Sequence, residues 1–118
     1  MRGAHLSGVA YEWAHHWPMA IAAGVSEEKL RALSDWPESP LFSEEERAAL
    51  RVTDEISGGP AASEEAVAKL KEHFTPSEVI ELTLTISFYV CVARLLKTLD
   101  VDIEPEYEGH AATLPAAR

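Results

Sequence analysis

Apolar residues recur at helical spacing through most of the chain, and capping residues and helix breakers divide this pattern into separate segments. An apolar stripe with positions three and four residues apart marks the face of a helix that packs on a core. The sequence therefore predicts an all-α fold. The five expected helices cover residues 7–23, 26–35, 43–57, 63–74 and 75–99.

Several helix starts are marked by capping residues. Ser43-x-x-Glu46 is a capping box, in which each side chain satisfies a free backbone N–H of the first turn. Thr75-Pro76-Ser77-Glu78 adds a proline at the first helical position to the same arrangement. Pro18 lies inside the first expected helix, where the loss of a backbone hydrogen bond predicts a kink.

The last expected helix is apolar nearly all round. Glu81, Arg94 and Lys97 interrupt it, so we interpret it as a buried core helix and not as a membrane span. Such a helix must be covered on every side, and four short helices cannot do this. The pattern therefore predicts self-association. Residues 103–118 are rich in Pro, Glu and Ala and are expected to form an extended tail of a single domain, 1–118.

Charge and cysteine content narrow the function classes. Twenty acidic and ten basic residues give a net charge of −10, which disfavours nucleic acid and anionic membrane surfaces as partners. A small-molecule substrate remains possible. The single cysteine, Cys91, cannot form an internal disulfide or a C-x-x-C pair. We see no signal peptide in the first residues, so a cytoplasmic location is expected.

The densest group of reactive side chains lies at residues 11–19. Glu12 and His16 are four residues apart, so they share a helix face and are expected to form a hydrogen-bonded acid/base pair. Tyr11 and His15 form a second such pair on the adjacent face. The alternative is an ordinary surface pair with no chemical role.

A metal site is not predicted. Glu12-x-x-His15 matches half of the E-x-x-H pattern of di-iron bundles, but the second half is missing. Trp13 and Trp17 flank the reactive group and indicate partial burial. From their residue type they are more typical of a core than of a substrate platform.

The stretch from Tyr11-Glu12-Trp13-Ala14-His15-His16 to Ala23-Gly24-Val25-Ser26 resembles the active-site helix of the carboxymuconolactone decarboxylase/AhpD-like family. Residues 41–55 and the stretch from Glu78 to Arg94 fit the family as well. The resemblance implies an AhpD-like bundle of about five helices that assembles as a trimer or hexamer. It also implies further helices before this motif, so either the reading frame is truncated or a neighbouring subunit completes the site.

The redox branch of this family uses a C-x-x-C pair followed by a histidine. These positions correspond here to Val9, Glu12 and His16, so thiol peroxidase chemistry has no nucleophile. The resemblance favours a cofactor-free lyase acting on a small carboxylated or lactone substrate. His16 would move the proton and Glu12 would tune it. Substrate contacts are expected from Tyr11, Trp13, His15 and Met19.

Two other functions remain open. One is a non-catalytic scaffold or small-ligand binder that kept the fold and lost the chemistry. The other is a residual AhpD-like peroxidase.

Overall fold

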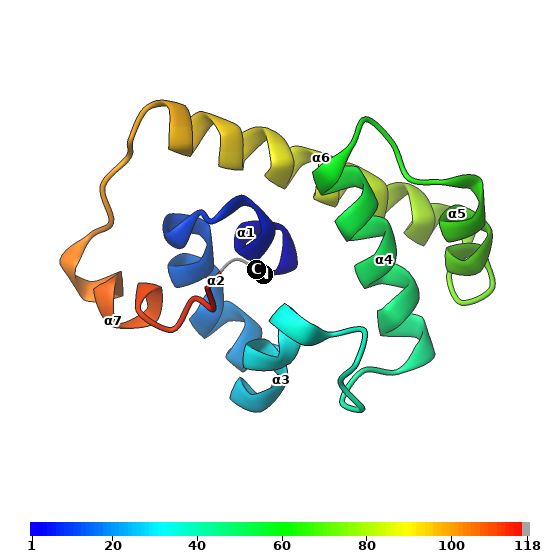
Figure 1. Cartoon of the computed structure of the whole chain (residues 1–118), viewed down its shortest axis with the longest axis horizontal. Helices are drawn as coiled ribbons and strands as arrows, with labels where there is room; N and C mark the ends of the chain where they lie inside the picture. The colour runs from blue at the N-terminus through cyan, green and yellow to red at the C-terminus, as the bar shows by residue number, and fades with distance from the viewer. Residues whose placement is uncertain (117–118) are drawn as a thin grey trace.

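The computed structural model describes residues 1–116, and every regular element in that range is helical. The all-α prediction is confirmed. Helix α1 lies in the centre, with α2 and α7 on one side of it, α4 on the other, and α6 running across the top of the view (Figure 1). The elements are α1 (Arg2–Ser7), α2 (Ala10–Ala22), α3 (Glu27–Arg31), the 3-10 helix η1 (Ala32–Asp35), α4 (Glu44–Gly58), α5 (Glu64–Lys71), α6 (Pro76–Thr98), the 3-10 helix η2 (Pro105–Tyr107) and α7 (Glu108–Ala111).

Side-chain caps begin four of these helices, including the two predicted at Ser43 and Thr75. Each cap side chain accepts a hydrogen bond from the backbone N–H three residues later, which satisfies one free donor of the first turn. Reciprocal capping boxes are present at Ser43 and at Thr75. The four cap residues are Ser26, Ser43, Ser63 and Thr75.

The first predicted helix is divided in two. The chain is already helical from Arg2 to Ser7 and then turns at Gly8, whose φ of 62° lies in the left-handed region. The N–H of Val9 closes the turn by donating to the carbonyl of Ala4 at 3.0 Å. Glycine adopts this backbone conformation without the penalty that a Cβ atom brings. The expected start at residue 7 was wrong because Gly8 ends one helix and separates it from the next.

Two clusters of buried side chains stabilise the molecule. The first joins α1 and α2 to the segment of α3 and η1, and it carries three tryptophans: its members are Ala4, Trp13, Trp17, Leu30, Leu33, Trp36 and Phe42. The second joins α4, α5 and α6 and consists of Ala48, Val52, Ala66, Leu70 and Ile86. Because α4 lies between these regions, it connects the two halves of the fold.

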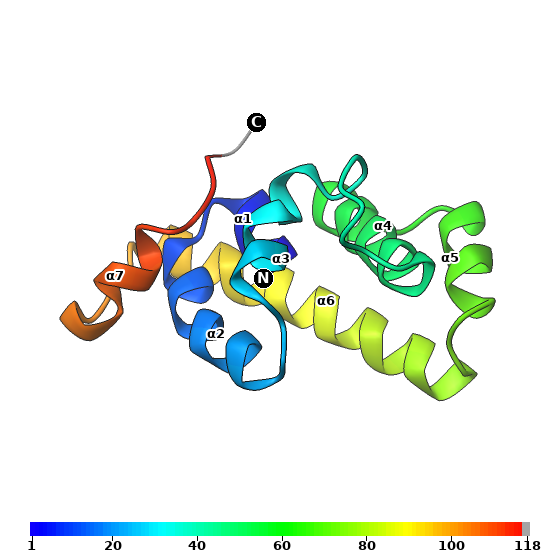
Figure 2. The same cartoon turned by 90° about the horizontal axis from the view of Figure 1, so that it is seen from below.

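Helix α6 is not the buried core helix that its sequence suggested. It lies along one edge of the molecule and packs against α1, α4 and α5 through one face only (Figures 1 and 2). Ile86 and Ala93 are its buried residues. The helix is long and apolar enough to cross a membrane by length and composition alone, and a single helix of this kind is weak evidence for a membrane span. Its outer apolar face comprises Ile80, Leu84, Phe88 and Leu95, each 57–64% exposed.

The C-terminal segment is also more ordered than predicted. Residues 105–111 form η2 and α7 where an extended tail was expected, and α7 packs along α2. Trp13 anchors this segment, because its Nε1–H donates to Thr113 Oγ1 at 2.9 Å. The last two residues of the expected tail lie outside the described residues. The tail departs from an extended form because it covers the apolar side of α2.

We expect Gly8→Ala to destabilise the protein. An added Cβ meets nothing closer than Lys97 Nζ at 3.9 Å, so the cost comes from the left-handed backbone and should be about 1–2 kcal/mol. Gly58→Ala is the matched control, because Gly58 ends α4 with open space around it and no positive φ. Urea denaturation measures both variants, and equal unfolding free energies for the two would contradict this account.

Candidate active site

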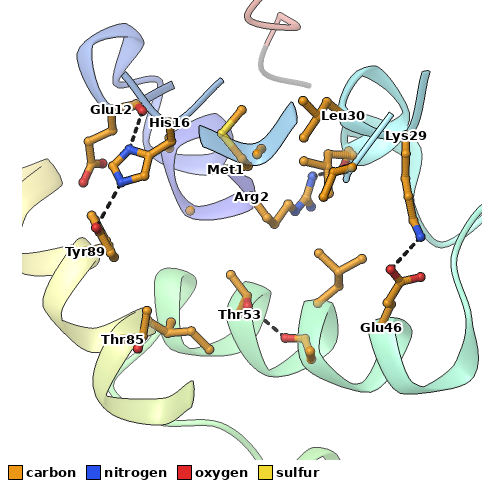
Figure 3. Close-up of a pocket in the computed structure, with 18 of the residues that line it drawn as sticks. Met1, Arg2, Glu12, His16, Lys29, Leu30, Glu46, Thr53, Thr85 and Tyr89 are labelled. Carbon is orange, nitrogen blue, oxygen red and sulfur yellow. Dashed lines mark hydrogen bonds and ion pairs between the residues drawn. The ribbon is translucent and has the colours of Figure 1, made fainter. Parts of the chain in front are cut away.

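A cavity of about 360 Å³ opens between α1, α2, α3, α4 and α6. Most of its wall is apolar, and Figure 3 shows two polar groups on opposite sides of the pocket, with Arg2 and Thr53 between them. One end holds Glu12, His16 and Tyr89, and the other holds Lys29 and Glu46. The apolar wall includes Ala4, Ala20, Val25, Leu30, Leu33, Phe42, Ala49, Leu50 and Ile86.

Glu12 and His16 reach the cavity from the same face of α2, as predicted. Their side chains, however, form no hydrogen bond with each other. The Nδ1 of His16 lies 2.8 Å from the backbone carbonyl oxygen of Glu12. A carbonyl oxygen can only accept, so Nδ1 carries the proton of this hydrogen bond. The expected carboxylate–imidazole pair is thus replaced by a bond to the backbone.

This hydrogen bond determines the role of the other ring nitrogen. In neutral His16, a proton on Nδ1 leaves Nε2 as an acceptor. The hydroxyl of Tyr89 lies 3.0 Å from Nε2 and therefore donates to it. The two rings meet edge to face, with centroids 4.9 Å apart. Tyr89 and His16 thus form a coupled pair that can exchange a proton.

From the sequence alone, no role was assigned to Tyr89. It stands 73 residues after His16 in the chain, so helical spacing cannot bring the two together. The stretch that resembles the family included Tyr89, but without an assigned role. The structure adds it to the site.

The carboxylate of Glu12 is buried and unpartnered. Glu12 is 4% exposed, and neither carboxylate oxygen has a hydrogen-bond partner among the described residues. Burial raises the pKa of Glu12, and the positive α-amino group of Met1 opposes this shift. A buried carboxyl group with a raised pKa can hold and release a proton closer to neutral pH than an ordinary glutamate does.

The opposite end of the cavity carries an ion pair. Lys29 Nζ lies 2.5 Å from Glu46 Oε1, and the ammonium also lies 5.6 Å from the centre of the Phe42 ring. The other carboxylate oxygen of Glu46 accepts from the backbone N–H of Ser43 in the capping box. Although burial of Glu46 acts to raise its pKa, the hydrogen bonds from Lys29 and Ser43 lower it overall. Glu46 therefore stays charged and fixes the position of the Lys29 ammonium.

Tyr11 and His15 lie on a different side of α2 from the cavity. The His15 ring is stacked between the rings of Tyr11 and Tyr107, at centroid distances of 4.1 and 4.0 Å. Its Nδ1 faces the backbone carbonyl of Tyr11 at 2.9 Å, and its Nε2 lies 3.2 Å from Glu104. These contacts join α2 to the C-terminal segment and hold both side chains away from the cavity lining.

Trp13 and Met19 are also separated from the cavity. Trp13 is fully buried in the first core cluster, because its indole fills the junction between α2 and the C-terminal segment. Met19 is 62% exposed on the surface of α2. The four expected substrate contacts, Tyr11, Trp13, His15 and Met19, are therefore absent from the described cavity lining. Within the described residues, no group of three metal-binding side chains occurs.

Comparisons with known proteins agree with this fold. Residues 1–55 match the carboxymuconolactone decarboxylase family. YnjA of Escherichia coli K12, an uncharacterized protein, is 38% identical over 77 residues, which make up 64% of this chain and 42% of YnjA. The crystal structure of ATU0492 from Agrobacterium tumefaciens, a protein of unknown function described as a candidate AhpD antioxidant defence protein, superimposes with a TM-score of 0.81. It is 26% identical and the match covers 87% of this chain and 72% of ATU0492.

The helical architecture defines an AhpD-like protein. The match of residues 1–55 and the likeness to an AhpD-like structure both support the carboxymuconolactone decarboxylase family for this chain. The match spans less than half the length of YnjA.

The raised pKa of Glu12 predicts a specific pH dependence of stability. Between the ordinary value of 4.5 and the raised pKa, the folded state binds more protons than the unfolded state, so the unfolding free energy falls as pH rises through this window. Glu12→Gln removes this effect. We therefore expect the difference in unfolding free energy, variant minus wild type, to be larger at pH 7 than at pH 4. Urea denaturation at the two pH values measures this difference.

The control for this experiment is Glu81→Gln, which alters an exposed glutamate on α6. It should show no comparable gain between the two pH values. If Glu12→Gln and Glu81→Gln gave the same pH profile, the buried carboxyl group would not be responsible.

Proposed function

We propose that this protein is an acid/base enzyme of the lyase type that acts on a small carboxylated or lactone substrate. The observation that carries the proposal is the hydrogen bond between Tyr89 and His16 beside the buried carboxyl group of Glu12, at one end of an apolar cavity. General acid/base catalysis typically uses titratable side chains that lie in an apolar pocket. The match of residues 1–55 to the carboxymuconolactone decarboxylase family is consistent with this reaction class.

The same groups suffice for a decarboxylation. The bond between the substrate carbon and its carboxylate breaks, carbon dioxide leaves, and the bonding electrons remain as an enolate. The Tyr89 hydroxyl supplies the proton that quenches this enolate. His16, which is hydrogen bonded to that hydroxyl, returns a proton to it from solvent. Glu12 provides a second proton store at the same end of the cavity.

Thiol chemistry is less well supported. Val9 and Glu12 occupy the positions where the redox branch of the family carries cysteines. Cys91 is exposed on α6 and does not belong to the described cavity lining. The similarity to ATU0492 therefore supports a shared fold, while the side chains around this cavity favour proton transfer.

The direct test is carbon dioxide release from a panel of lactone carboxylates and β-keto acids, including carboxymuconolactone. We expect turnover that falls about a hundredfold or more in His16→Ala and in Tyr89→Phe, because each variant removes a proton carrier. His15→Ala is the matched control, since this neighbouring histidine lies outside the cavity lining. An equal loss in His15→Ala, or no turnover by the wild type on the whole panel, would contradict the proposal.

We also propose that a second copy of this chain covers the outer face of α6. Ile80, Leu84, Phe88 and Leu95 form a contiguous exposed apolar row at helical spacing, and a row of this kind on a soluble protein marks an interaction surface. The trimer or hexamer implied by the family resemblance would use this face.

Leu84→Glu should dissociate such an assembly, because it would bury an unpaired charge in the contact. Analytical ultracentrifugation of wild type and variant measures the mass, and Ser77→Glu at the exposed start of α6 is the control. A wild-type protein that sediments as a monomer at micromolar concentration would rule out this interface.

A further inference from the structure

The Lys29 end of the cavity has features that the proposed acid/base chemistry does not use. Two basic side chains, Arg2 and Lys29, belong to the cavity lining, and they differ in how their donors are occupied. Arg2 donates to both carboxylate oxygens of Asp54, at 2.6 and 2.8 Å. It also donates to the carbonyl of Leu33 at 2.7 Å. Its guanidinium is therefore committed to the fold.

The ammonium group of Lys29 has fewer of its hydrogen-bond donors occupied. An ammonium group has three N–H donors, and Lys29 makes one hydrogen bond, to Glu46, among the described residues. Its side chain is 26% exposed, so it is half-buried at an end of the cavity that ligand and solvent can reach. Glu46 holds the ammonium in place while the capping box occupies its second oxygen. Two donors of a fixed cation remain available to a ligand.

The local charge also differs from that of the whole chain. The protein has a net charge of −10, whereas the charges around the cavity are balanced: Arg2 is paired with Asp54, Lys29 with Glu46, and the Met1 α-amino group acts on Glu12. Burial shifts the balance further, because it raises the pKa of Glu12 and so favours its neutral form. An anionic group at the Lys29 end therefore avoids the repulsion that it would meet over most of the surface.

The wall between the two ends is mostly apolar, although Arg2 and Thr53 also lie there. Leu30, Leu33, Phe42 and Leu50 line it, and Figure 3 shows Lys29 and Glu46 on the opposite side of the pocket from His16 and Tyr89. A compact polar molecule would make few contacts with these apolar side chains. A ligand with an apolar body fills it and gains burial free energy from each methylene group.

We infer that Lys29 is a specificity-determining residue, which binds the carboxylate of a substrate whose apolar body spans the cavity toward His16 and Tyr89. The substrate class is thus an apolar-bodied carboxylate with its reacting group at the end remote from that carboxylate. This inference rests on the proposed function for the chemistry at the His16 end, but the binding at Lys29 is testable without any turnover.

The test uses octanoate as the probe, with octanamide as the neutral analogue and butyrate as the short analogue. Isothermal titration calorimetry on the whole chain should give octanoate the highest affinity. We expect about a tenfold preference over octanamide, because a hydrogen bond to a charged group contributes more than a neutral one. We expect octanoate to bind at least tenfold more tightly than butyrate, because butyrate lacks four methylene groups.

Variants locate the binding. Lys29→Met should abolish the preference for octanoate over octanamide, and Lys29→Arg should retain it. Lys71→Met, at an exposed lysine at the end of α5, is the control. Ala49→Phe should block binding by filling the cavity, whereas Ala68→Phe, the same substitution at an exposed alanine of α5, should leave it unchanged.

The outcomes separate this inference from the proposed function. Equal affinities for octanoate and octanamide in the wild type, or octanoate binding that survives Ala49→Phe, would overturn the inference. Octanoate binding that depends on Lys29 and persists in His16→Ala would support it, even if no substrate on the panel releases carbon dioxide. In that case the proposed lyase reaction alone would be wrong.

Discussion

The burial of two tryptophans on one side of α2 determines how the rest of the molecule is arranged. Trp13 and Trp17 lie in the first core cluster and fix the rotation of α2 about its own axis. Because side chains project every 100° around a helix, this rotation decides which residues reach the cavity. Glu12 and His16 face the cavity, while Tyr11 and His15 face the C-terminal segment. A core contact thus selects between two adjacent histidines.

The local features of the fold could be predicted from the sequence, because they depend on residues close together in the chain. The capping boxes at Ser43 and Thr75 and the shared face of Glu12 and His16 are of this kind. Gly8 was misjudged because a glycine can either continue a helix or end it, and only its φ decides. The pattern of α6 indicated that four short helices cannot cover it, but it could not indicate which of its residues this chain leaves exposed.

The candidate site was less predictable, because half of it comes from distant segments. Tyr89 on α6 and Lys29 on α3 reach the cavity through packing, and no spacing rule links them to α2. The expected side-chain bond between Glu12 and His16 also failed, because the backbone carbonyl of Glu12 offers His16 a closer partner. The carboxyl group of Glu12 is therefore left without a partner among the described residues. Its burial lowers the unfolding free energy at neutral pH, as is typical of titratable groups in active sites.

The contacts between α2 and the C-terminal segment bear on the order in which the protein matures during synthesis. Tyr11 and Glu104 are 93 residues apart in the chain, and Trp13 and Thr113 are 100 apart. Closing such long loops is slow, and it cannot happen before residues 104–113 have left the ribosome. The side of α2 that this segment covers therefore stays open until the segment has been synthesised, and the site helix takes its final position only after that.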